Sequence, residues 1–117
     1  MSIAQTPEPP YTAVIFSSLR TDGDHGYDVM SERMGELAAA QPGYLGIESA
    51  RDGLGITVSY WRSEADAAAW KQVMAHTVAQ QRGRDVWYSE YRVRIATVTR
   101  DYGSSDSHHS DSSLPGH

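Results

Sequence analysis

The sequence predicts an α+β fold whose elements follow the order β-α-β-β-α-β. Short runs rich in β-branched and aromatic residues alternate with two stretches of helical periodicity. Glycine and proline separate these stretches from one another. Right-handed crossovers place both helices on one face of a four-stranded antiparallel sheet, so the predicted class is ferredoxin-like.

Four strands are expected, at residues 11–19, 44–50, 56–61 and 91–99. The first strand (YTAVIFSSL) has Ala13 and Ile15 on one face and Val14 and Phe16 on the other. Residues 51–55 (RDGLG) have the composition of a turn, so the second and third strands are predicted to form a hairpin.

The first helix is expected at residues 27–40. Its apolar residues recur at spacings of three, four and three, at Tyr27, Met30, Met34 and Leu37. The run Gln41-Pro42-Gly43 ends it, because proline cannot continue a helix and glycine takes the left-handed conformation easily.

The second helix is expected from residue 64 to about residue 81. Ser63 is its predicted N-cap, and Glu64 and Asp66 complement the positive end of the helix dipole. Gly83 ends it, and residues 85–89 are predicted to form one further helical turn. The apolar stripe comprises Ala67, Trp70, Val73, Met74 and Thr77.

Composition excludes several classes of function. The 117 residues carry 15 acidic and 10 basic side chains, a net charge of −5. Three of the acids lie in residues 101–117, which have no base, so residues 1–100 have 12 acids against 10 bases. This near-neutral body has no basic footprint for nucleic acid. The chain has no cysteine, and it has no P-loop, glycine-rich dinucleotide motif, HExxH or GxSxG.

The two ends of the chain differ in composition from its middle. Residues 1–10 hold three prolines and are predicted to be an extended arm, residues 11–102 the folded domain, and residues 103–117 a disordered tail. The opening residues resemble no secretory signal, and no apolar run reaches the roughly 20 residues of a membrane helix. A cytoplasmic protein with no membrane or nucleic-acid partner and no native metal site is expected.

Strands one, three and four carry apolar residues on both faces, whereas the two helices can cover only one face. An uncovered second face would expose a contiguous apolar patch, which monomers avoid. The sequence therefore predicts a homodimer in which two sheets face each other. The alternative is a moderately apolar face that stays in contact with solvent.

Several short runs resemble the antibiotic biosynthesis monooxygenase (ABM) domain family, and within it the small stand-alone bacterial proteins. These runs are PGYLG at 42–46, YWRSE at 60–64, Trp70-Lys71, His76 and GRDVWY at 83–88. The resemblance spans about residues 11–102. It implies a dimeric α+β barrel with one pocket per protomer, between the sheet and its helices.

The resemblance implies two possible chemistries. One branch of the family oxygenates phenols and quinols without metal or flavin. Another degrades haem, with a histidine ligand and a tryptophan on the second helix and an asparagine on the first strand. Here His76 comes about one turn earlier than that ligand, and the first strand has Phe16, Ser17 and Ser18 instead of asparagine. The asparagine one turn before the tryptophan in the first branch is Asp66 here.

His76 and Trp70 are the catalytic candidates. His76 lies about 120° around the second helix from Trp70, on the flank of the apolar stripe. A histidine so placed can reach a pocket while one nitrogen stays near water, and imidazole suits proton transfer near neutral pH. The alternatives are a half-exposed histidine that packs on a neighbour and a tryptophan that belongs to the core.

Seven further residues are candidates for binding the substrate. They lie on the strands, on the second helix or just before the last strand: Tyr60, Trp61, Phe16, Ser18, Met74, Arg92 and Trp87. An arginine such as Arg92 can hold a phenolate or a carboxylate, and the alternative is a solvated position on an edge strand.

Three functions therefore remain open. The first is a cofactor-independent monooxygenase that oxidises a small aromatic phenol or quinol with O₂. The second is a haem-binding or haem-degrading protein with His76 as ligand. The third is a dimeric module that binds a small molecule without turnover, which a pocket packed shut by Met74, Phe16 and Trp70 would favour.

Overall fold

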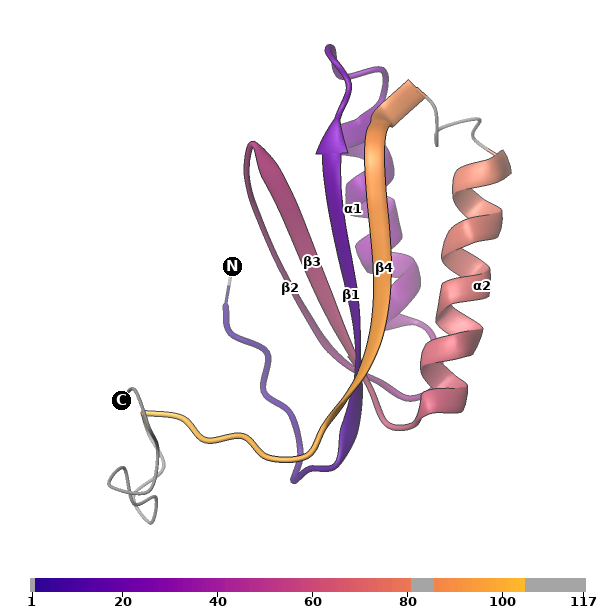
Figure 1. Cartoon of the computed structure of the whole chain (residues 1–117). Helices are drawn as coiled ribbons and strands as arrows, with labels where there is room; N and C mark the ends of the chain where they lie inside the picture. The colour runs from indigo at the N-terminus through magenta and orange to yellow at the C-terminus, as the bar shows by residue number, and fades with distance from the viewer. Residues whose placement is uncertain (1, 81–85, 105–117) are drawn as a thin grey trace.

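The computed structural model describes residues 2–80 and 86–104 and has the predicted α+β fold (Figure 1). Its elements are β1 (Tyr11–Arg20), α1 (Tyr27–Ala39), β2 (Tyr44–Asp52), β3 (Leu54–Trp61), α2 (Glu64–Gln80) and β4 (Tyr88–Val98). The strands form one antiparallel sheet in the order β2-β3-β1-β4, and both helices lie on the same side of it. The ferredoxin-like prediction is confirmed.

Residues that pair across the sheet share a face, because side chains alternate along each strand. Three successive rungs of paired residues face the helices. From the α2 start toward the α1 start they are Ile47, Ser59, Val14 and Ile95; then Ser49, Thr57, Phe16 and Val93; then Arg51, Gly55, Ser18 and Tyr91. Ile15, opposite Val58 and Arg94, lies on the other face, which we call the open face.

The core lies where the helices approach the sheet most closely. Its buried members are Val14, Ala38, Trp61, Ala67 and Trp70. The Trp61 side chain is fully buried, stacks on the Trp70 ring at a centroid distance of 5.6 Å, and donates its indole N–H to Ser59 Oγ at 2.9 Å. The indole polar group is therefore satisfied inside the core.

Two element boundaries differ from the prediction. The β2–β3 hairpin is tighter than a turn at 51–55, because Gly53 adopts φ 80° and Asp52 already pairs with Leu54. In the stretch 85–89, only residues 86 and 87 are helical among those described, and β4 begins at Tyr88. Tyr88 is extended because it pairs with Arg20 in the ladder with β1.

Other predicted boundaries agree with the structure. Ser63 caps α2, since its Oγ accepts the Asp66 N–H at 3.1 Å. Gly43 has φ 80° in the turn that follows α1. Gly83 and residues 105–117, for which a helix end and a disordered tail were predicted, lie outside the described residues. No helix in the described part of the chain is long and apolar enough to cross a membrane.

The open face is partly covered by the chain itself, contrary to the expectation that only a second subunit could cover it. The N-terminal arm turns back beside β2, where the Ala4 N–H donates to Glu48 Oε2 at 2.9 Å (Figure 1). Tyr11 and Ala13 are buried at this end of the face. At its other end Leu19, Leu54 and Ile56 stay exposed, at 40, 50 and 41%.

Candidate functional site

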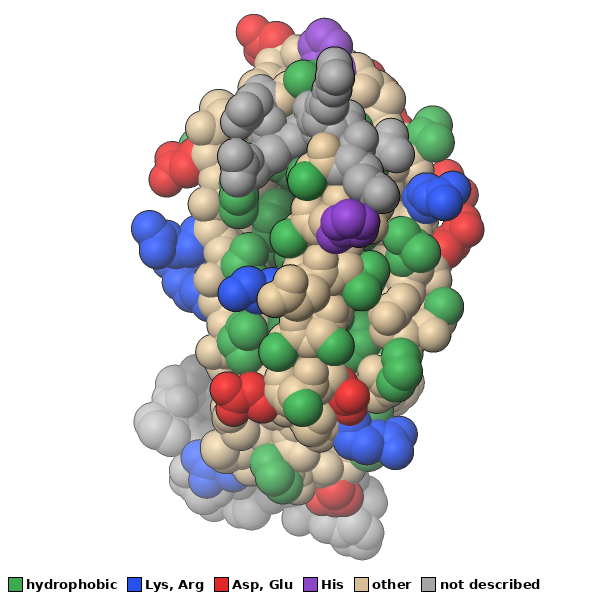
Figure 2. All heavy atoms as spheres, turned by 90° about the vertical axis from the view of Figure 1, so that its right-hand side faces the viewer, with side chains coloured by type: hydrophobic (Ala, Val, Ile, Leu, Met, Phe, Trp, Pro, Cys, Tyr) green, Lys and Arg blue, Asp and Glu red, His purple; other side chains and the backbone are tan. Residues whose placement is uncertain are grey.

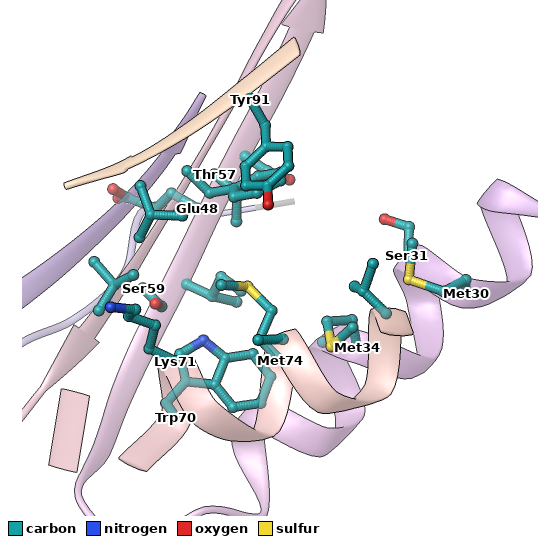
Figure 3. Close-up of a pocket in the computed structure, with 18 of the residues that line it drawn as sticks. Met30, Ser31, Met34, Glu48, Thr57, Ser59, Trp70, Lys71, Met74 and Tyr91 are labelled. Atoms are coloured by element: carbon teal, nitrogen blue, oxygen red, sulfur yellow. The ribbon is translucent and has the colours of Figure 1, made fainter. Parts of the chain in front are cut away.

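A pocket of about 1300 Å³ lies between the sheet and both helices (Figure 3). Met30 and Met34 reach it from α1, and Trp70 and Met74 from α2. The pocket is open rather than packed shut, although Trp70, Met74 and Phe16 all line it. A collapsed site, which would have favoured a binding module without turnover, is not what the structure shows.

The sheet wall of the pocket combines apolar and hydroxyl side chains. Val14 and Phe16 supply apolar surface, and Ser49, Thr57 and Ser59 supply hydroxyl groups. The Ser59 hydroxyl already accepts the Trp61 indole N–H. This wall can therefore pack against an aromatic ring and offer a small number of hydrogen bonds, which is typical of small-molecule sites.

Three tyrosines gather where β4 begins and α1 begins, and we call this region the tyrosine end of the pocket. Tyr27, Tyr88 and Tyr91 all line the cavity. The Tyr27 and Tyr88 rings meet edge to face at 5.8 Å, and Phe16 packs against Tyr88 at 5.3 Å and Tyr91 at 5.7 Å. Figure 3 shows the Tyr91 hydroxyl directed from the sheet toward the helices.

Burial, with smaller contributions from the nearby Tyr27 phenol and its hydrogen bond, raises the pKa of Tyr88 far above its ordinary value of 10.0. The positive charges of Arg51 and Arg20 act in the opposite direction without cancelling this effect. The Tyr88 hydroxyl is therefore neutral near pH 7 and can donate a hydrogen bond into the pocket.

Two guanidinium groups stand behind the tyrosine end. The Arg20 Cζ atom lies 3.6 Å from the Tyr27 ring centroid, and the Arg51 Cζ atom lies 5.9 Å from it. Arg51 crosses the third rung to donate to the Ser18 carbonyl at 3.1 Å and to Ser18 Oγ at 2.6 Å. It passes over Gly55, where any Cβ would collide with the guanidinium group.

The N-terminal arm borders the pocket at the β2 edge, where Ser2 and Ile3 line it. Glu48 holds this border in place. Its Oε2 accepts the Ala4 N–H and its Oε1 accepts the Tyr60 hydroxyl at 2.6 Å. Burial, with a further contribution from the Glu48 carboxylate, raises the pKa of Tyr60 well above 10.0.

The structure brings together only some of the residues that the sequence proposed. Trp70, Met74 and Phe16 line the pocket. Trp61 and Ser18 are buried directly behind its walls. The other four lie elsewhere. Tyr60 and Arg92 are on the open face, and His76 is on the outer surface of α2. Trp87 is buried beside the pocket and donates its indole N–H to the His25 carbonyl at 2.9 Å.

His76 is exposed because α2 turns its other flank to the pocket. Lys71, Ala75 and Ala79 line the cavity beside Trp70. At about 100° per residue, Lys71 lies about 100° from Trp70 in one sense, and His76 about 120° in the opposite sense. The angular separation from Trp70 was inferred correctly, but the sequence did not tell which flank faces the cavity. Figure 2, seen from the α2 side, shows hydrophobic side chains interspersed with charged and histidine side chains on this outer surface.

The pocket lining includes many residues that the sequence analysis did not place in the site, among them Tyr27, Tyr91 and Lys71. Tyr27 was assigned only to the apolar stripe of the first helix. Tyr88 was expected in a helical turn, where it either closes a pocket mouth or packs the loop. Extending the fourth strand back to Tyr88 would have placed Tyr88 and Tyr91 near the helix-facing rungs. Lys71 adjoins Trp70 in the chain, which is the one signal that marked it.

The pocket does not fit the haem reading in which His76 is the ligand. His76 lies on the opposite flank of α2, and the described residues that line the cavity include no histidine. The sulfur and oxygen atoms of the side chains that line the cavity belong to methionine, tyrosine, serine and threonine residues and to Glu48. Both Glu48 carboxylate oxygens already accept hydrogen bonds. The described residues also hold no cluster of three or more metal-binding side chains.

Comparison with known proteins identifies a close relative. The chain is 53% identical over 100 residues to the uncharacterized protein YqjZ of Bacillus subtilis, covering 84% of this chain and 88% of YqjZ. The chain belongs to the YqjZ family. No model of a known protein family matches the sequence. A match of 32% over 56 residues links this YqjZ-family member to the jasmonate monooxygenase ABM of Pyricularia oryzae, over 48% of this chain and 26% of that protein.

Solved structures place the YqjZ-family chain in the ABM fold. A mutant form of the cofactor-independent oxygenase SnoaB of Streptomyces nogalater superposes with a TM-score of 0.63 at 10% identity, over 78% of this chain and 95% of SnoaB. The heme-degrading protein Rv3592 of Mycobacterium tuberculosis has a TM-score of 0.51 at 16% identity, over 81% and 99%. At these identities the likeness concerns the fold, and it confirms the ABM resemblance at that level.

Proposed function

We propose that this protein is a monooxygenase that uses O₂ to oxidise a small electron-rich aromatic molecule, a phenol, quinol or anthrone, without metal or flavin. The observation that carries the proposal is the open pocket of about 1300 Å³, with an aromatic and thioether lining, between the sheet and helices of an ABM fold. Monooxygenases and a cofactor-independent oxygenase among the similar proteins support the reaction class.

The substrate can supply every electron that the reaction needs. In an anthrone, deprotonation gives an electron-rich anion that transfers electrons to O₂. The ring methylene then becomes a carbonyl, whose oxygen is one atom of O₂, and the other oxygen atom leaves as water with the two methylene hydrogens. The protein has to bind the anion, hold O₂ beside it and limit access of water.

Two pocket residues are assigned to this task. Trp70 presents a buried indole to the cavity, and it packs against the substrate ring. Lys71 lines the cavity beside it, and an ammonium group there stabilises the substrate anion and so favours deprotonation. The proton leaves to water at the mouth of the pocket. His76, the base expected from the sequence, lies outside the cavity and is left without this role.

Oxygen uptake tests the proposal directly. Wild-type protein is mixed with an anthrone and, separately, with a naphthohydroquinone, and O₂ consumption is followed with an electrode against a protein-free blank. We expect substrate-dependent uptake above the blank and a loss of about ten-fold or more in Lys71→Gln. The matched control is Gln72→Ala, an exposed neighbour on α2 that does not line the pocket.

Two outcomes would refute the assignment. Uptake equal to the blank with every substrate, in a protein that still binds these molecules, would support a binding module without turnover. Haem titration that gives a Soret shift abolished by His76→Ala would support the haem alternative, against the position of His76 in the structure.

We further propose that the open face pairs two copies of the chain. Leu19, Leu54 and Ile56 form an exposed apolar surface at the end that the arm leaves uncovered. Light scattering coupled to gel filtration is expected to give twice the chain mass of 12.9 kDa. Ile56→Lys should shift the mass toward the monomer, whereas Val29→Lys, at an exposed site on α1, should not.

A further inference from the structure

The two arginines at the tyrosine end have no acidic partner in the described part of the chain. Arg51 donates to the carbonyl of Ser18, to its hydroxyl and to the Gly53 carbonyl at 3.4 Å. Arg20 donates to the backbone carbonyls of Trp87, Gly23 and Asp24. All these partners are neutral oxygens, so two positive charges remain uncompensated beside one end of the cavity.

Tyrosine side chains lie beside these charges and line the cavity. Tyr27 lies between the Arg20 guanidinium, 3.6 Å from its ring centroid, and the pocket that it lines. Tyr88 and Tyr91 line the same end, and the positive charges of both guanidinium groups favour the anionic form of Tyr88. Phenolic O–H groups donate strong hydrogen bonds to anions, and a neighbouring cation strengthens such bonds.

We propose that the tyrosine end is a subsite for an anionic group, a carboxylate on the substrate, which accepts hydrogen bonds from Tyr27, Tyr88 and Tyr91 and is stabilised by the charge of Arg51. This inference rests on the proposed function only in identifying the ligand as the substrate. It defines the substrate class more narrowly, as an aromatic acid whose acidic group is remote from the ring that reacts.

The geometry separates this subsite from the reacting end. The reacting end lies at the rung of Ser59, which faces Trp70 and Lys71 in Figure 3. The subsite lies at the rung of Gly55, which also holds Tyr91 and Arg51. Ser59 and Gly55 are four residues apart on β3. At about 3.3 Å per residue, the two rungs lie about 13 Å apart. A ligand of three fused rings can extend from the Trp70 rung toward the tyrosine end and place a carboxylate there.

A matched pair of probes tests the subsite without any need for turnover. 2-Naphthoate and 2-naphthamide have the same ring and nearly the same shape, but only the first carries a charge. We expect isothermal titration calorimetry on the full chain to show 2-naphthoate binding about ten-fold or more tightly than the amide, the ratio that hydrogen bonds to a charged group provide.

Variants locate the preference within the pocket. Arg51→Gln keeps a donor for Ser18 and removes the charge, and it should reduce the ratio of the two affinities to near one. Tyr88→Phe should weaken naphthoate binding several-fold and leave naphthamide binding unchanged. Arg33→Gln removes one charge from the exposed face of α1, away from the pocket lining, and should preserve the ratio.

Several results would overturn the proposal. The first two are equal affinity of the two probes for the wild type and no binding of either probe at millimolar concentration. The third is an unchanged affinity ratio in both Arg51→Gln and Tyr88→Phe. The fourth is loss of the ratio in Lys71→Gln alone, a result that would place the anion at the other end of the pocket. A preserved charge preference with no O₂ uptake would refute the monooxygenase and leave the subsite standing. Uptake with no charge preference would do the reverse.

Discussion

The two ends of the layer between helices and sheet differ in what their side chains can do. At one end, which we call the tryptophan end, Trp61 and Trp70 stack beside Ala38 and Ala67, and all four are buried. The two alanines let the helices approach the sheet closely. At the tyrosine end the aromatic rings carry hydroxyl groups and stand next to guanidinium groups, and the layer stays open.

This difference shows how one sheet face can provide both stability and a site. Close packing at the tryptophan end fixes the helices on the sheet, and dispersion contacts there are dense. The hydroxyl and guanidinium groups at the tyrosine end need hydrogen-bond partners when they are buried. They therefore favour a cavity that water or a ligand fills. We therefore expect substitutions of Trp61 and the two alanines to change stability, and substitutions at the tyrosine end to change binding.

The largest effect is expected for Trp61→Ala. It removes a fully buried ring, its stacking on Trp70 and its hydrogen bond to Ser59, and it should lower the free energy of unfolding by about 3–5 kcal/mol. The control is Val78→Ala in the pocket wall, which should cost less than about 1 kcal/mol. Urea unfolding measures both. Equal losses would show that the pocket wall contributes to stability as much as the buried core does.

Gly43→Ala should have the next largest effect and tests how the tryptophan end is closed. Gly43 has φ 80°, and a Cβ there would collide with the Asp66 carboxylate at the start of α2. Left-handed backbone geometry costs an alanine about 1–2 kcal/mol, and the collision adds to this. We expect a loss of about 2 kcal/mol or more in urea unfolding. Gly53→Ala is the control, since it shares the positive φ but its Cβ would meet nothing within 4 Å. An equal loss in both would assign the whole effect to φ.

The fold was predictable from the sequence because its signals are local. Proline and glycine at 42–43, the Ser63 cap and the alternation of residues 11–19 each specify one element without reference to the others. The β2–β3 turn was predicted too long, since composition cannot show that Gly53 alone reverses the chain. The start of β4 was missed because Tyr88 is extended through its pairing with β1, which is a long-range interaction.

The site was less predictable because it depends on how elements meet. Trp70 was found through its place in the apolar stripe, but the choice between His76 and Lys71 requires knowing which flank of α2 faces α1. Arg51 was assigned to a turn, and only the sheet register brings it over Gly55 to Ser18. The hydroxyl and guanidinium groups of the tyrosine end come from β1, α1, β2 and β4, so no single stretch of sequence contains their pattern.

A smaller effect, on pH dependence, should distinguish the tyrosine end. The pKa of Tyr88 is raised in the folded protein, so above pH 10 the unfolded chain loses its proton first. The unfolded state then binds fewer protons than the folded state, and the free energy of unfolding falls as pH rises. Well below pH 10 both states are protonated, and this contribution is constant. Tyr88→Phe should decrease the loss between about pH 9 and about pH 11 relative to wild type, as measured by urea unfolding across that range. A loss as large in Tyr88→Phe as in the wild type would contradict the assignment.

The smallest effect is expected for His76→Ala, and it tests the orientation of α2. His76 is exposed on the flank opposite Lys71, so its removal should change the free energy of unfolding by less than about 0.5 kcal/mol and leave naphthoate affinity unchanged. Lys71→Ala is the matched substitution on the pocket flank and should change O₂ uptake. If instead His76→Ala abolished uptake while Lys71→Ala did not, α2 would have to be rotated about its axis in the active protein. Such a rotation would also withdraw Ala75 and Ala79 from the cavity, because all four positions are fixed on one helix.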